Sequence, residues 1–327
     1  MRITIFGAGG VGSVVAGHLA RSGAEVITVA RPGHAAAIKQ KELTVTGLSD
    51  FHVPVPVQTD ALNVESTDVL LITVKTTAMP AALEGTRHIA VGCVASLQNG
   101  VVKNAQLAKV FGHNKVLGSA TMIGASLVQD GEVRYTLDGV TFFGEMHGAR
   151  SDRSDRISGM FLDAGLASAS VENIESIEWT KQMIQNPFAT VATITRLPVH
   201  LVWSDPDLAA LSIHMLREVA QVAKALKIAL SAHEAWSLFD LKTLADGTFS
   251  EAVESLITVG EKAGKSGRAH IVPSMLQDVL AGKPTEIEET VGHVLSEGKR
   301  LGISLPYTDF AYRTVKAIEA NYPARHK

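Results

Sequence analysis

A glycine-rich loop close to the start of the chain constrains the fold more than any other feature. The loop, Gly7-Ala8-Gly9-Gly10-Val11-Gly12, follows a short apolar run and precedes a stretch of helical character over residues 12–22. The spacing G-x-G-x-x-G between a strand and a helix is typical of a dinucleotide-binding turn. There Gly7 allows the tight bend, Gly9 lets backbone N–H groups approach a pyrophosphate, and Gly12 lets helix and strand pack closely. Since a helix N-terminus carries partial positive charge, we expect this loop to bind a dinucleotide cofactor.

Apolar, β-branched runs recur through the first half of the chain, at residues 3–6, 25–30, 69–74 and 93–97. Near-continuous apolar runs suit strands that are buried on both faces, as in a parallel sheet with crossover helices. The pairs Asp130-Gly131 and Asp138-Gly139 are hairpin signals, so we expect the sheet to end in antiparallel strands.

The second half of the chain has a different sequence pattern, with few β-rich runs and long helical patterns from about Ser176 onward. Thr285 and Glu288 have the spacing of a capping box at the start of one such helix. The sequence therefore predicts an α/β fold with two domains. Residues 1–172 form an N-terminal Rossmann-type doubly wound sheet, and residues 173–327 form a C-terminal all-helical domain that carries substrate-binding and catalytic residues.

Composition excludes several classes of protein. The chain has 327 residues, 46% of them hydrophobic, so it can bury a sizeable core. Its net charge of −3 lacks the basic excess of nucleic-acid and membrane-surface binders. Cys93 is the single cysteine, and the histidines show no metal-ligand spacing. We expect a cytoplasmic protein without a metal, a nucleic-acid partner or a membrane segment.

Polar residues follow three of the predicted strands. An NAD site usually has an acidic residue after the second strand, but this chain has Arg31, which suits the 2′-phosphate of NADP(H). Lys75 and Asn99 follow two further strands. Because ligands of open α/β sheets gather at the carboxyl ends of strands, we expect both residues to bind cofactor, and Asn99 also to bind substrate.

Together these residues resemble the ketopantoate reductase family, the NADPH-dependent 2-dehydropantoate 2-reductases. The glycine loop, Arg31, Val-Lys-Thr at 74–76 and Gln-Asn-Gly at 98–100 match in order. In the second half, the segments that match the family are Trp-x-Lys at 179–181, Ser-Met-Leu-Gln-Asp at 274–278 and Thr-Glu-Ile at 285–287. The resemblance implies that Lys181 is the catalytic acid and that Ser274 contacts substrate. It also implies that Glu286 acts in catalysis and contacts the cofactor, and that the protein forms a homodimer.

One stretch departs from the family pattern. The family carries asparagines four and eight residues after the lysine, where this chain has Gln185 and Ala189. Asn186 is displaced by one position, which on a helix turns a side chain by about 100°. Pro187 follows directly and is able to distort the helix. We expect Gln185 to contact substrate, and the identity of the 2-oxo acid stays open.

Three functions are consistent with the residues. The first is NADPH-dependent reduction of a small 2-oxo acid to the 2-hydroxy acid, by default 2-dehydropantoate to pantoate in pantothenate biosynthesis. The second is a related 2-hydroxyacid or opine-type dehydrogenase that acts on another acid. The third is a non-catalytic NADP(H)-binding sensor, which would need neither Lys181 nor Glu286.

Overall fold

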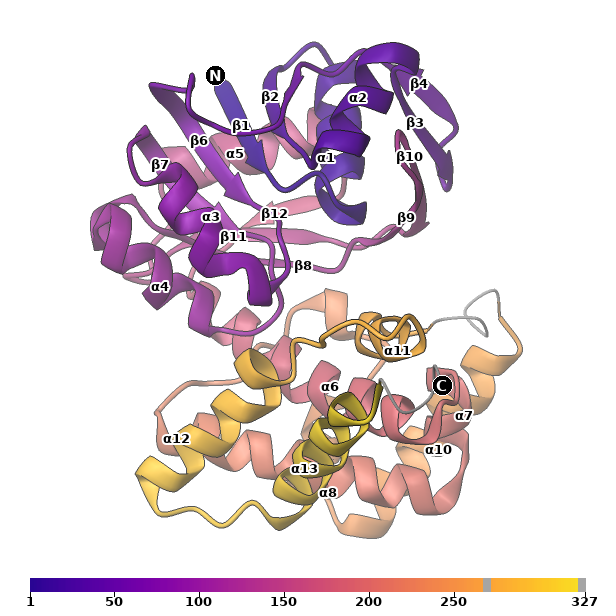
Figure 1. Cartoon of the computed structure of the whole chain (residues 1–327). Helices are drawn as coiled ribbons and strands as arrows, with labels where there is room; N and C mark the ends of the chain where they lie inside the picture. Colours follow the sequence, from indigo (N-terminus) through magenta and orange to yellow (C-terminus); the bar gives the residue numbers. More distant parts are fainter. Residues whose placement is uncertain (267–271, 323–327) are drawn as a thin grey trace. The chain divides into compact units, whose positions relative to one another are not determined.

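The structure is a computed structural model that describes residues 1–266 and 272–322 (Figure 1). It divides into two compact units, Met1–Glu175 and Ser176–Lys327. The first unit combines strands and helices, and the described part of the second is helical. Within the described residues, no helix has the length and apolar character needed to cross a membrane.

The first unit alternates strands with helices along the chain. Its strands are β1 (Arg2–Phe6), β2 (Glu25–Val29), β3 (Leu43–Gly47), β4 (Phe51–Val53), β5 (Val57–Gln58), β6 (Ser66–Ile72), β7 (Ala90–Ser96), β8 (Leu117–Thr121), β9 (Gly124–Gln129), β10 (Glu132–Leu137), β11 (Thr141–Glu145) and β12 (Ser168–Ser170). Its helical elements are α1 (Gly10–Arg21), α2 (Pro32–Lys41), η1 (Thr76–Ala78), α3 (Met79–Thr86), α4 (Val102–Phe111), η2 (His113–Lys115) and α5 (Asp152–Asp163).

The central sheet of this unit is parallel and has the strand order β5-β2-β1-β6-β7. Alternate side chains of each strand enter two different cores. Ile3 and Ile5 pack with α1, α2 and α5, whereas Leu70 and Ile72 pack with α3 and α4 on the opposite face. Apolar burial on both faces explains the continuous apolar runs in the sequence. The predicted Rossmann-type doubly wound sheet is confirmed.

The sequence predicted that the central sheet ends in antiparallel strands, and this prediction is wrong. The later strands instead form two separate sheets, with the orders β4-β3-β10-β9 and β12-β11-β8. The Asp130-Gly131 hairpin is confirmed between β9 and β10, with Gly131 at φ +82°. The Asp138-Gly139 hairpin is wrong, because β10 and β11 lie in different sheets. Gly139 has no positive φ, and the Asp138 carboxylate accepts a hydrogen bond from the Tyr135 hydroxyl at 2.6 Å.

The second unit is built from helices. They are α6 (Ile174–Thr195), α7 (Val199–Ser204), α8 (Pro206–Ala225), η3 (Glu234–Trp236), α9 (Leu241–Asp246), α10 (Phe249–Gly264), α11 (Ser274–Leu280), a π-helical turn η4 (Glu288–Gly292), α12 (His293–Leu301) and α13 (Pro306–Ala320).

The predicted capping box of Thr285 and Glu288 is wrong. Both the backbone N–H and the hydroxyl of Thr285 donate to Glu319 of α13, at 2.7 and 2.6 Å. The Glu288 carboxylate accepts from Tyr312 at 2.7 Å and pairs with Lys316 at 2.8 Å, also on α13. Glu288 therefore does not close the box, although the Thr285 hydroxyl still accepts a local bond from the backbone N–H of Ile287 at 3.3 Å. The chain then enters a π-helical turn.

A buried ion pair holds α5 against the end of β11. The Glu145 carboxylate is only 3% exposed and accepts hydrogen bonds from Arg153 Nε at 2.6 Å and from the Ser151 hydroxyl at 2.5 Å. Burial acts to raise the pKa of Glu145, but the hydrogen bonds from Arg153 and Ser151 and the charge of Arg153 outweigh it, so this pKa lies below its usual value. Ionised Glu145 therefore stabilises the folded state.

We predict that Glu145→Gln lowers the free energy of unfolding by about 2–3 kcal/mol at pH 7, because it leaves Arg153 partly buried without its counter-charge. A carboxyl with a lowered folded-state pKa stabilises above the unfolded pKa, about 4.3, and loses that contribution as pH falls through the folded pKa. In urea melts, the difference from the parent protein should stay constant above about pH 5 and shrink below about pH 4. Glu84→Gln, at the exposed Arg87 pair, is the control and should change little. A pH-independent difference would contradict the prediction.

Candidate active site

The glycine loop turns sharply at the carboxyl end of β1. Gly7 has φ +114°, a conformation that glycine adopts readily, and a Cβ there would lie 2.7 Å from the backbone nitrogen of Val74. The backbone N–H groups of Gly7 and Ala8 both donate to the carbonyl of Val29, each at 3.0 Å. These bonds tie the loop to the end of β2, the strand after which Arg31 follows.

The start of α1 lies very close to the strand ends. A Cβ on Gly12 would collide with the carbonyl oxygen of Gly7, and one on Gly10 would lie 2.7 Å from the carbonyl oxygen of Ala125 in β9. The hydroxyl of Thr73, just after β6, donates to the Gly7 carbonyl at 2.7 Å. Sequence analysis missed Thr73, because nothing local marks a threonine after a strand as a support of the loop.

The surroundings of Gly9 fit a bound diphosphate. A Cβ placed on Gly9, the N-cap of α1, would find no heavy atom within 4 Å. The first turn of α1 has no acidic residue, and its leading amides have no acceptor inside the helix. Partial positive charge and donors without an acceptor inside the helix thus lie beside open space at the point where the sequence predicted a dinucleotide.

Arg31 lies at the end of β2 as the exposed N-cap residue of α2, whose first turn is also free of acidic residues. Among residues 1–266 and 272–322, no hydrogen bond or ion pair engages its guanidinium. The fixed positive charge can therefore receive an anionic group without first giving up a protein partner.

Lys75 and Asn99 follow β6 and β7, so with Arg31 they lie at the carboxyl edge of the parallel sheet. Lys75 is exposed and Asn99 is half-buried. The structure adds two residues to this edge to which sequence analysis gave no role of their own. Gln98 is 6% exposed and neither of its amide atoms has a hydrogen-bond partner, while buried Lys103 donates to the Gly100 carbonyl at 2.8 Å. A buried amide without partners can bind a polar ligand at little further desolvation cost.

In the second unit, α6 carries Lys181 and Gln185 one turn apart, both half-buried. The helix continues through Pro187, so Asn186 lies on a different face from Gln185. Asn186 is 6% exposed and its Nδ2 has no hydrogen-bond partner. Gln182, one turn earlier on the same face as Asn186, is also buried with both amide atoms unpaired.

The structure brings two of the three motif segments of the second unit into one hydrophobic core. Ser274 is the first residue of α11, after Pro273 at the N-cap, and Glu286 is 8% exposed just before the π-helical turn. Their neighbours Met275 and Ile287 belong to one hydrophobic cluster, against which Ile194 of α6 packs.

Trp179 also links α6 to this region, because its ring centroid lies 6.2 Å from that of His293 at the start of α12. Burial lowers the pKa of His293, and the nearby Glu297 charge opposes this shift, so the imidazole is neutral at pH 7. The helix that carries Lys181 is thus held against the segment that follows Glu286 by an uncharged aromatic contact.

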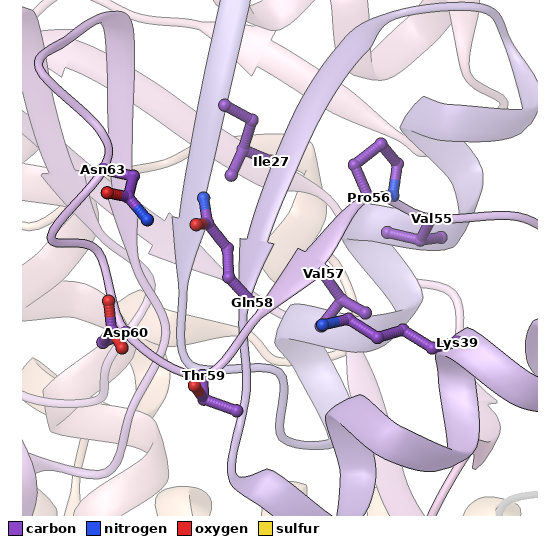
Figure 2. A pocket seen from close by; sticks show the side chains of 9 residues that line it. All are labelled: Ile27, Lys39, Val55, Pro56, Val57, Gln58, Thr59, Asp60 and Asn63. Carbon is purple, nitrogen blue, oxygen red and sulfur yellow. The ribbon is translucent and has the colours of Figure 1, made fainter.

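The first unit has a groove of about 730 Å³. Figure 2 shows the side chains that line it, which are Ile27, Lys39, Val55, Pro56, Val57, Gln58, Thr59, Asp60 and Asn63. It follows the edge strand β5 and contains none of the predicted site residues. Its polar side chains are largely exposed, so solvent already satisfies them. We therefore place the candidate site by the chemistry of the glycine loop and the strand ends, not by the size of this groove.

Comparison with known families gives matches to both halves of the chain. The model of the family described as ketopantoate reductase PanE/ApbA matches residues 3–148, and the model of its C-terminal domain matches residues 173–319. The 2-dehydropantoate 2-reductase of Archaeoglobus fulgidus is 29% identical over 319 residues, which is 98% of each chain.

Solved structures show the same fold. A PanE/ApbA family ketopantoate reductase from Ralstonia eutropha JMP134 is similar with a TM-score of 0.82 at 24% identity, covering 99% of this chain and 100% of that one. D-mandelate dehydrogenase in complex with NADH and anilino(oxo)acetate has a TM-score of 0.83 at 21% identity, with the same coverage of 99% and 100%.

We predict opposite effects for alanine at two glycines of the loop. Gly9→Ala should leave the free energy of unfolding within about 0.5 kcal/mol of the parent value, since its methyl meets no neighbour. It should weaken binding of the nicotinamide dinucleotide at least about tenfold, by filling the space expected for the pyrophosphate. Gly12→Ala should cost roughly 2 kcal/mol or more, because the methyl collides with backbone. Urea melts and fluorescence titration with NADPH measure the two quantities. Unchanged NADPH affinity in Gly9→Ala would refute the assignment of the loop.

Proposed function

The chain belongs to the ketopantoate reductase family, and we propose that it reduces a small 2-oxo acid with NADPH, with 2-dehydropantoate as the substrate and pantoate as the product. The observation that carries the proposal is the match of both halves to this family, together with a relative of that activity over 98% of the chain. The protein is an oxidoreductase of the class that acts on CH–OH groups. The homodimer, the cytoplasmic location and the role in pantothenate biosynthesis stay predictions.

The residues of the first unit fit a bound NADP(H). The start of α1 would hold the diphosphate, and Arg31 would hold the 2′-phosphate in a charge-assisted, bidentate contact. Lys75, Asn99 and Glu286 are the further cofactor contacts that we propose. The bound nicotinamide would supply the hydride for the carbonyl carbon.

Lys181 is the proton donor in this proposal. Reduction turns the carbonyl oxygen of the substrate into an alkoxide, which needs a hydrogen-bond donor and a proton. The Lys181 ammonium carries three N–H bonds, and its half-buried place on α6 limits the competition from water. Buried Glu286 would orient the ammonium or a hydroxyl group of the substrate.

Ser274, Asn99 and Gln185 are proposed to orient the substrate. A hydroxyl and two carboxamides can donate hydrogen bonds to a carboxylate and accept them from a substrate hydroxyl. Fixing the carboxylate fixes the carbonyl carbon for reduction.

A second candidate function is reduction of a different 2-oxo acid. Gln185 and Ala189 stand where the family pattern has asparagines, so fewer amide groups on that face of α6 are available to substrate hydroxyls. D-mandelate dehydrogenase has the same fold and binds anilino(oxo)acetate, a compound with a 2-oxo acid group and no hydroxyl chain. A bulkier, less hydroxylated acid is therefore the alternative.

We predict that Lys181→Ala lowers kcat by about 10²–10⁴-fold, because the developing alkoxide loses its proton donor, while NADPH affinity stays within about twofold. The assay is NADPH oxidation at saturating 2-oxo acid, with fluorescence titration for the affinity. Lys224→Ala, at an exposed lysine of α8, is the matched control and should keep full activity. Equal turnover in Lys181→Ala would remove Lys181 from the chemistry.

A substrate panel separates the two candidate functions. If 2-dehydropantoate is the substrate, its kcat/KM should exceed that of every other 2-oxo acid tested. If an aryl or branched 2-oxo acid is turned over faster, the reductase chemistry stands and the alternative substrate class is correct. NADPH binding without turnover of any acid would contradict both and favour the sensor.

We predict that Arg31→Ala raises the Kd for NADPH by at least about tenfold and leaves the Kd for NADH nearly unchanged, since only NADPH carries the 2′-phosphate. Arg21→Ala, which removes a charge from the last turn of α1, is the control. If both cofactors weaken equally in Arg31→Ala, the residue does not read the 2′-phosphate.

A further inference from the structure

We propose that His34 is a positioning residue that sets the preference for NADPH over NADH by holding the first turn of α2, and with it Arg31, against α1. This inference rests on the proposed function, because it requires Arg31 to bind the 2′-phosphate. It adds a determinant of cofactor selection that does not itself touch the cofactor.

The His34 imidazole is 2% exposed and has a partner at each nitrogen. Its Nε2 lies 3.1 Å from the hydroxyl oxygen of Ser13, and its Nδ1 accepts a hydrogen bond from the backbone N–H of Gly131 at 2.9 Å. Since Nδ1 accepts, the ring proton of the neutral imidazole lies on Nε2 and is donated to Ser13. One buried ring thus joins α1, α2 and the turn between β9 and β10.

The helix that carries Arg31 has few other attachments. Only His34, Ala35 and Ile38 of α2 are buried, and the helix has no side-chain cap at its N-terminus. Two of these three are small or medium aliphatic side chains, which fix a helix less tightly than directional bonds do. The bond between the N–H of Ala35 and the carbonyl of Arg31, at 2.9 Å, links the anchored turn directly to the arginine.

Ser13, the partner of His34 on α1, lies next to the glycine loop. Ser13 follows Gly12 directly, is fully buried, and donates its backbone N–H to the carbonyl of Gly9 at 2.9 Å. The Ser13–His34 bond therefore fixes the distance between the turn that faces the diphosphate and the turn that presents Arg31. A ligand that bridges the two turns gains from this preorganisation.

The turn between β9 and β10 completes the contact. A Cβ on Gly33 would collide with the Asp130 carboxylate, so the turn packs closely on the first turn of α2. Asp130 Oδ1 lies 3.9 Å from His34 Nδ1, and this is the charged group that faces the ring. Burial lowers the pKa of His34 and the Asp130 charge opposes this, which leaves the ring neutral at pH 7, as its acceptor role at Nδ1 requires.

Three variants test the proposal through the Kd values for NADPH and NADH in fluorescence titrations of the full chain. Ser13→Ala and His34→Asn both remove the bond to α1, although asparagine can still accept from Gly131. Each should raise the Kd for NADPH roughly tenfold and leave the Kd for NADH within about twofold. His34→Gln can still donate to Ser13 and should retain most of the preference for NADPH.

Unchanged NADH binding shows that these variants are folded, and a purely structural role would weaken both cofactors together. Equal weakening of NADPH and NADH, or no change for either, would overturn the proposal.

The double variant Arg31→Ala/Ser13→Ala tests the role of His34 separately from the proposed binding of NADPH by Arg31. If His34 acts through Arg31, adding Ser13→Ala to Arg31→Ala should change the Kd for NADPH no further. A further loss there would overturn the role of His34 while Arg31 keeps its own. If Arg31→Ala alone leaves the preference unchanged, the proposed NADPH assignment fails, and the inference fails with it.

Discussion

The near contact between the start of α1 and the ends of β1, β6 and β9 is the constraint on which the first unit depends. Side chains are missing where backbone meets backbone, at Gly7, Gly10 and Gly12. The Thr73 hydroxyl bonds to the Gly7 carbonyl and closes the gap on one side. The first amides of α1 lie beside the open space at Gly9, which is the one loop glycine whose Cβ would meet no atom within 4 Å. The open space at Gly9 thus lies directly beside closely packed backbone.

The local spacing of the sequence predicted the glycine loop, the parallel strands and the helical character of the second half, since each depends on neighbours in the chain. The features that local spacing did not predict depend on contacts with residues far along the chain. Gly139 lacks the positive φ of a hairpin, and β10 pairs instead with β3, so the second Asp-Gly turn was misread. His34 is unremarkable in the sequence, because its role comes from Ser13 and Gly131 together.

In the second unit, contacts with a distant helix also override a local sequence signal, at Thr285. Its spacing to Glu288 matched a capping box, yet Glu319 of α13 takes both donors of Thr285, and Lys316 holds the Glu288 carboxylate. Hydrogen bonding to Lys316, which outweighs partial burial, lowers the pKa of Glu288 and keeps this pair ionised. The segment that carries Glu286 is thereby tied to α13, in addition to its local bonds from Ile287 N–H to Thr285 and from the Thr290 hydroxyl to the Glu286 carbonyl. The segments around Ser274 and Glu286 were identified from resemblance, whereas the core that Met275 and Ile287 share is visible only in the structure.

The β9–β10 turn has a consequence for how the protein is made. By the time a ribosome has released β1, α1, β2 and α2, the glycine loop and Arg31 are both present in the nascent chain. The backbone N–H that donates to His34 Nδ1 belongs to Gly131, much later in the chain. Likewise β3 pairs with β10, in which Glu132 is aligned with Thr44. Such distant pairings form late, because a long loop must close first. Until synthesis has passed this turn, the nascent chain leaves Nδ1 of His34 without its Gly131 donor and one edge of β3 without β10. An open strand edge of this kind is prone to aggregation.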